Sequence, residues 1–167
     1  MIELIAKHAI GKAVTGEALV AHDGFSARYD LDRIGGTFSR PTHKLAGKSY
    51  VGKILVLDTA KGGVASAWML REMASRGIIP LALVFNSVNP ILAQGAAFGD
   101  VTLLAGFDGE ITQQVPNGAR VEIDPARRSL RILSTQSTFP PRSFTTAPTS
   151  PAVRHEISTW CTGFAPC

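Results

Sequence analysis

One segment, residues 53–77, limits the possible folds of this chain more than any other. It reads KILVLDTAKGGVASAWMLREMASRG. The continuous apolar run Ile54–Leu57 is typical of a strand that is covered on both faces. Apolar residues then recur at helical spacing until Gly77, which is a helix stop signal. The segment therefore predicts a buried strand, a tight glycine turn and an amphipathic helix in succession.

The turn in this segment contains a glycine pair. Gly62 and Gly63 allow positive φ and a close approach of the backbone to a ligand. The first N–H groups of a helix have no intrahelical acceptor and lie at the positive end of the helix dipole. We therefore predict an anion-binding and substrate-binding site at Gly62, Gly63, Val64 and Ala65. A purely structural connection is the alternative, because a double glycine alone is an unspecific signal.

The rest of the pattern predicts an α/β fold with a mixed sheet, flanking helices and hairpins. A strand is expected at each of residues 18–21, 81–85 and 101–105, and a hairpin at residues 120–124 and 129–133. Asn89 followed by Pro90 predicts the start of a short helix that continues to Ala97. Residues 22–47 are rich in glycine and charge, which indicates a long functional excursion rather than regular structure.

Length and composition favour one folded domain followed by a tail. The chain has 167 residues, of which 45% are hydrophobic and 18% charged, so it can bury a sizeable core. We predict a domain over residues 1–133 and a Pro/Ser/Thr-rich C-terminal tail over residues 134–167. Cys161 and Cys167 lie in this tail and are too few for a disulfide framework.

Charge and hydropathy argue against a nucleic-acid partner and against a membrane partner. The formal net charge is +4, but lysine and arginine are scattered among acidic residues, so no nucleic-acid partner is predicted. No apolar run approaches the roughly 20 residues needed to cross a bilayer. Glu3 and Lys7 interrupt the N-terminal apolar stretch, which is therefore a poor signal peptide. We expect a cytoplasmic protein with an anionic small-molecule substrate or an acidic partner subunit.

Three segments resemble the swivelling domain of the aconitase X family, also called the DUF126 family. They are GEALVAHDG at 16–24, PTHKLAGKSYVGKILVLDTAKGG at 41–63 and RGIIPLALVFNSVNPILAQGA at 76–96. The resemblance implies a swivelling β/β/α domain that forms the small subunit of a hydro-lyase and closes over a larger aconitase-like subunit. It also implies dehydration of a small hydroxy acid, such as cis-3-hydroxy-L-proline or mevalonate 5-phosphate. An iron or iron–sulfur centre is expected in the large subunit, and this chain alone is expected to bind no metal.

The resemblance also suggests site residues. Family members commonly have G-R-G-S-S or G-R-G-S-C at the turn, with a serine proposed as the base, whereas Gly63 stands at the first serine position. Ser66 is the nearest hydroxyl and becomes the candidate catalytic base, the alternative being a helix-capping role. His43 lies in the family's histidine loop and is predicted to bind substrate or to stabilise the loop. Arg28 and Arg40 flank this loop and could bind a carboxylate or phosphate, or be solvated.

Two alternatives to the hydro-lyase hypothesis remain open. Thr59, the glycine pair and Ser66 fit the T-x-x-G-G-x-x-S-H pattern of the phosphohistidine domain of phosphoenolpyruvate-utilising enzymes. Ala67 stands where that family has its phosphorylated histidine, so a carrier would lack its nucleophile. The other alternative is a non-catalytic lid or assembly module. The favoured hypothesis is a dehydratase subunit that is active only with its large subunit.

Overall fold

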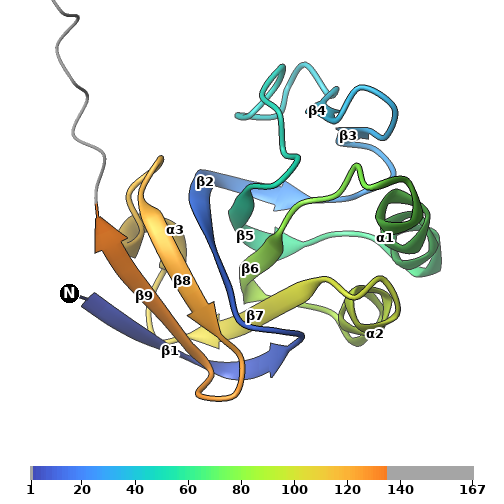
Figure 1. The fold of residues 1–167 in the computed structure, drawn as a ribbon. Coiled ribbons are helices and arrows are strands. Elements are labelled where there is room, and N and C mark those ends of the chain that lie inside the picture. The colour runs from blue at the N-terminus through green and yellow to red at the C-terminus, as the bar shows by residue number, and fades with distance from the viewer. Residues whose placement is uncertain (1, 135–167) are drawn as a thin grey trace, which may run out of the picture. The chain divides into compact units, whose positions relative to one another are not determined.

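The structure is a computed structural model, and it describes residues 2–134. These residues form three layers, which are a pair of helices, a central parallel sheet and a smaller antiparallel sheet (Figure 1). The predicted mixed α/β architecture is therefore confirmed. The predicted C-terminal tail lies outside the described residues, except for Ser134.

Two long strands join the two sheets into a closed barrel. The parallel strands β2, β5, β6 and β7 form the central sheet, and β8 and β9 form an antiparallel hairpin. One half of β1 pairs with β7 and the other half with β9, and β2 pairs in the same way with β5 and β8. The barrel strands are β1 (Ile2–Ile10), β2 (Val14–Phe25), β5 (Ile54–Ala60), β6 (Ala82–Ser87), β7 (Thr102–Phe107), β8 (Arg120–Asp124) and β9 (Ser129–Ser134).

Both faces of the central sheet are buried, which explains the continuous apolar run found in the sequence. On β5, Ile54 and Val56 belong to the buried cluster between the two sheets. Leu55 and Leu57 belong to a separate cluster with helix residues such as Leu70. Because successive strand side chains point to opposite faces, a strand in the middle layer needs apolar residues at every position.

Two helices cover the outer face of the parallel sheet (Figure 1). Helix α1 (Val64–Arg76) ends at Gly77, which has a left-handed φ of 70°. Helix α2 (Pro90–Phe98) begins at Asn89, whose side chain accepts a hydrogen bond from the Leu92 N–H at 2.8 Å. Both helices, with the predicted stop and cap, are thus confirmed.

The structure differs from the sequence-based expectation in three places. Strand β1 was not predicted, and its sequence IELIAKHAI does not alternate regularly between apolar and polar residues. The excursion expected at residues 22–47 begins later, because β2 extends to Phe25, and it contains the short pair β3 (Leu31–Asp32) and β4 (Thr37–Phe38). The single turn of helix α3 (Ile111–Gln114) was also not predicted.

Candidate functional site

The glycine turn lies between the end of β5 and the start of α1, beside the end of β2. Phe25 of β2 pairs with Ala60 of β5 at this edge. In doubly wound folds, ligands bind at the carboxyl ends of the parallel strands. Residues 61–64 are all exposed to solvent. The structure therefore places the predicted anion site at an open edge of the sheet.

The first backbone N–H groups of α1 are available to a ligand. Gly63 is the N-cap residue, and no side chain caps the helix. The N–H groups of Val64 and Ala65 find no acceptor among the described residues, whereas those of Ser66 and Ala67 bond to the Gly63 carbonyl. Because the helix dipole adds positive potential here, the turn can bind a carboxylate or a phosphate.

Only one residue of the glycine pair has a positive φ. Gly62 has a φ of +127°, and a Cβ added there would lie 2.4 Å from the Ser66 Oγ. Gly63 has a φ of −116°, and a Cβ added there would meet no atom within 4 Å. The expectation of positive φ thus applies to Gly62 alone, and Gly63 has room for a side chain.

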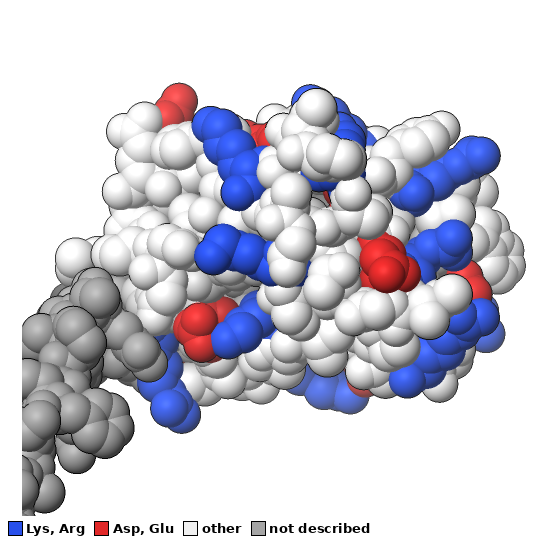
Figure 2. All heavy atoms as spheres, turned by 90° about the horizontal axis from the view of Figure 1, so that it is seen from above, with Lys and Arg blue, Asp and Glu red and all other residues white. Residues whose placement is uncertain are grey.

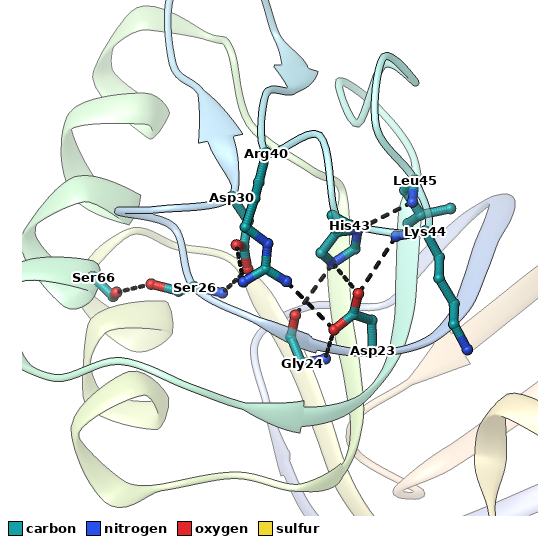
Figure 3. Close-up of polar contacts among 9 residues, drawn as sticks. All are labelled: Asp23, Gly24, Ser26, Asp30, Arg40, His43, Lys44, Leu45 and Ser66. Atoms are coloured by element: carbon teal, nitrogen blue, oxygen red, sulfur yellow. Dashed lines mark hydrogen bonds and ion pairs between the residues drawn. The ribbon is translucent and has the colours of Figure 1, made fainter.

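Ser66 lies beneath the turn rather than on its surface. Its relative exposure is 1%, and its hydroxyl oxygen is 3.4 Å from that of Ser26 (Figure 3). The Ser26 N–H in turn donates to Oδ2 of Asp30 at 2.8 Å. The hydroxyl of Ser66 therefore reaches the loop that follows β2, and a substrate can meet it only if the turn moves.

The sequence predicts the same anion-binding role for Arg40 and Arg28, but the two side chains have different contacts in the structure. Nη1 of Arg40 lies 3.0 Å from Oδ1 of the buried Asp30, and its Nη2 lies 3.5 Å from Oδ1 of Asp23 (Figure 3). Arg28 is exposed, stacks over the Tyr29 ring at 5.3 Å and forms no ion pair within the described residues. Arg40 therefore belongs to the polar network beside the turn, and Arg28 does not.

His43 uses both ring nitrogens within the protein. Its Nδ1 accepts the Leu45 N–H at 3.1 Å, and its Nε2 lies 3.2 Å from the Gly24 carbonyl. The His43 side chain is buried, and its ring stacks on Phe38 with a centroid distance of 4.6 Å. A carbonyl can only accept, so Nε2 carries the proton. These contacts support the loop-stabilising role, and substrate binding by His43 stays a prediction.

Asp23, at the end of β2, connects the loop to the strand and was missed by the sequence analysis. Burial alone would raise the pKa of its carboxyl. The hydrogen bonds from the Gly24 and Lys44 N–H groups and the nearby His43 and Arg40 side chains together lower the pKa by more, so it lies below its usual value. No sequence signal identifies this residue, because a carboxylate before a glycine is common in turns.

A second polar cluster at the same edge was also missed. Nδ1 of His22, on β2, lies 2.8 Å from Oγ1 of Thr112 on α3. The same hydroxyl donates to Oδ1 of Asp58, on β5, at 2.9 Å. The three residues are far apart in the sequence, and the only signal is that polar side chains follow buried runs in β2 and β5.

The outer faces of α1 and α2 form an apolar groove of about 320 Å³. Trp68 and Phe98, on its rim, are each 65% exposed. The only charged residue in its lining is Arg71. The groove therefore lacks the groups needed for proton transfer and is not the candidate site.

Neither the distribution of surface charge nor the search for metal ligands identifies a further site. Figure 2 shows lysine and arginine dispersed over one face, with aspartate and glutamate between them. Within residues 2–134, no group of three or more His, Cys, Asp or Glu side chains is placed to bind a metal ion. The helices of this part of the chain are all too short or too polar to cross a membrane.

Comparison with solved structures supports the fold. The crystal structure of Thermococcus kodakaraensis aconitase X in its holo form matches with a TM-score of 0.75 and 23% identity, covering 80% of this chain and 100% of that chain. The solution NMR structure of a UPF0107 protein matches with a TM-score of 0.67 and 25% identity, over 80% of this chain and 100% of that chain.

Comparison with sequences identifies the family. The phosphomevalonate dehydratase small subunit of Pyrococcus horikoshii is 30% identical over 126 residues, which is 75% of this chain and 92% of that protein. The phosphomevalonate dehydratase small subunit of Methanopyrus kandleri is 29% identical over 116 residues, which is 70% of this chain and 86% of that protein. Residues 3–132 match the family model described as the aconitase X swivel domain. The resemblance seen in the sequence is thereby confirmed, and the chain belongs to the aconitase X swivel domain family.

Proposed function

We propose that this chain is the small subunit of an aconitase X type dehydratase, a hydro-lyase that works only with a larger catalytic subunit. The observation that carries the proposal is the match to phosphomevalonate dehydratase small subunits over most of the length of both chains. The open turn before α1 supports it, because a small subunit that closes over an anionic substrate needs an accessible anion site. A cytoplasmic location is expected for such a subunit.

The substrate of the proposed enzyme is a small anionic hydroxy acid. Mevalonate 5-phosphate is the first choice, because of the relatives' names, and cis-3-hydroxy-L-proline is the second. The unpaired N–H groups of Val64 and Ala65 suit the phosphate or carboxylate of either molecule. We expect an iron or iron–sulfur centre in the large subunit, where it would polarise the leaving hydroxyl.

Co-expression with the large subunit tests the proposed function. We expect the two chains to elute as one complex in size-exclusion chromatography and to dehydrate mevalonate 5-phosphate or cis-3-hydroxy-L-proline. The isolated chain is expected to dehydrate neither compound, because the metal centre is expected in the large subunit and no group of three or more His, Cys, Asp or Glu side chains within residues 2–134 could hold one. Two separately eluting proteins would contradict the proposal, and activity of the isolated chain would indicate a self-contained enzyme.

The burial of Ser66 supports a second candidate, in which this chain closes the site without using that serine as the base. Ser66→Ala is then expected to lower the free energy of unfolding by about 1 kcal/mol, because the buried Ser26 hydroxyl loses its partner. The kcat of the assembled complex is expected to stay close to wild type. Urea denaturation and steady-state kinetics measure the two effects. A loss of about 10² to 10⁴ in kcat would instead establish Ser66 as the base.

A further inference from the structure

The cluster of His22, Thr112 and Asp58 has a defined direction of hydrogen bonding. A carboxylate only accepts, so the single hydroxyl proton of Thr112 goes to Oδ1 of Asp58 at 2.9 Å. Oγ1 of Thr112 must then accept the second bond of 2.8 Å, and its donor is Nδ1–H of His22. The neutral His22 ring therefore has its free lone pair on Nε2.

Thr112 and Asp58 of this cluster are held in position by the surrounding structure. Thr112 is 6% exposed, and the helix that carries it is held at its start by the Ile111 N–H, which donates to Oδ1 of Asn86 at 2.8 Å. Asp58 lies on β5 in the middle of the parallel sheet. The histidine side chain itself is 44% exposed, so solvent and small molecules can reach it. The arrangement combines a rigid support with an accessible imidazole.

Asp58 also lies directly beside the imidazole. Its Oδ1 is 3.5 Å from Nδ1 of His22, so the carboxylate faces the Nδ1 side of the ring. A base of this kind accepts a proton at Nε2 while the carboxylate and the hydroxyl hold the ring in place. Asp58 and Thr112 are therefore positioning residues for His22.

Other groups near the turn are less suited to accept a proton. Ser66 is 1% exposed, and both nitrogens of His43 are already hydrogen-bonded. Gly63 has no side chain at the position where family members have a serine. His22 lies four residues before Ser26 in the sequence, so their Cα atoms are at most about 14 Å apart.

We propose that His22 is the proton acceptor that this subunit supplies to the assembled dehydratase. This proposal rests on the proposed function above. Nε2 takes the proton from the carbon next to the hydroxyl-bearing carbon. The C–H electron pair forms the new double bond, the C–O bond breaks, and the departing hydroxide takes a proton from solvent to become water. The imidazolium then returns its proton to solvent, which restores the neutral ring.

Kinetics of the co-expressed complex test this assignment with mevalonate 5-phosphate and cis-3-hydroxy-L-proline as probes. His22→Ala should lower kcat by about 10² to 10⁴ with little change in KM, and added imidazole should restore part of the activity. Thr112→Val should lower kcat to a smaller extent, because the ring loses its support. His8→Ala, a matched change of an exposed histidine on β1, should have no effect. A His22→Ala complex with wild-type kcat would overturn the assignment.

A measurement on the isolated full-length chain separates this inference from the proposed function. Nitrogen-15 NMR of the neutral His22 ring should show the proton on Nδ1, and Thr112→Val should shift the ring towards a mixture of tautomers. A neutral ring with its proton on Nε2 would overturn the inference even if the complex is an active dehydratase. A wild-type complex that dehydrates neither probe would count against the proposed function, whatever the tautomer.

Discussion

Arg40→Met is expected to lower the free energy of unfolding by about 3–5 kcal/mol. Asp30 is 1% exposed, and the guanidinium of Arg40, 3.0 Å from its Oδ1, is its only ion-pair partner in the described residues. Methionine fills similar space but leaves the carboxylate buried without a compensating charge, which is costly in a low dielectric. Urea denaturation at neutral pH measures the loss.

Two further variants show whether the buried charge is the cause. Arg28→Met, at an arginine without an ion pair within residues 2–134, should change stability by no more than about 0.5 kcal/mol. Adding Asp30→Asn to Arg40→Met should recover part of the loss, because the uncompensated charge is then gone. An Arg40→Met protein as stable as wild type would show that the carboxylate of Asp30 needs no partner. Arg40 would then be free to bind substrate, as the sequence predicted.

Much of the fold follows from local sequence patterns. The apolar run at Ile54–Leu57, the stop at Gly77 and the Asn89-Pro90 cap each specify a structure within a few residues, and all three are confirmed. Strand β1 escaped detection because its pairing partners β7 and β9 lie about a hundred residues or more further along the chain, as in the pairs Ala6–Phe107 and Ile2–Ile132. Closure of the barrel depends on the same distant pairing, which a local pattern cannot show.

Only the backbone of the candidate site could be predicted from the sequence. A glycine turn before a helix exposes N–H groups whatever surrounds it, so the turn could be located from the sequence, and anion binding there stays a prediction. The burial of Ser66 could not be predicted, because it depends on Ser26, which lies in the covering loop 40 residues earlier. The same holds for the His22 cluster, whose three members come from β2, β5 and α3. Side-chain networks of this kind become visible only after the chain has folded.

Gly62→Ser is expected to destabilise the protein by about 2–4 kcal/mol. The φ of +127° is rarely adopted by residues with a side chain, and the new Cβ would lie 2.4 Å from the Ser66 Oγ. The turn or the start of α1 must therefore shift. Because Val64 and Ala65 follow directly, we also expect weaker anion binding at their N–H groups. Chemical denaturation and phosphate titration followed by NMR measure the two effects.

Gly63→Ser is the matched control, because it makes the same chemical change one residue later. The φ of −116° suits any residue, and the added Cβ would meet no atom within 4 Å. Serine is also favoured at an N-cap, so stability should stay unchanged or rise by a few tenths of a kcal/mol. Equal losses from the two variants would contradict the assignment of positive φ to Gly62 alone. With the expected result, the Gly63→Ser protein carries a hydroxyl where the aconitase X resemblance places a serine. Its kcat in the complex, with His22 intact or replaced by alanine, then shows whether that hydroxyl can take over the proton transfer.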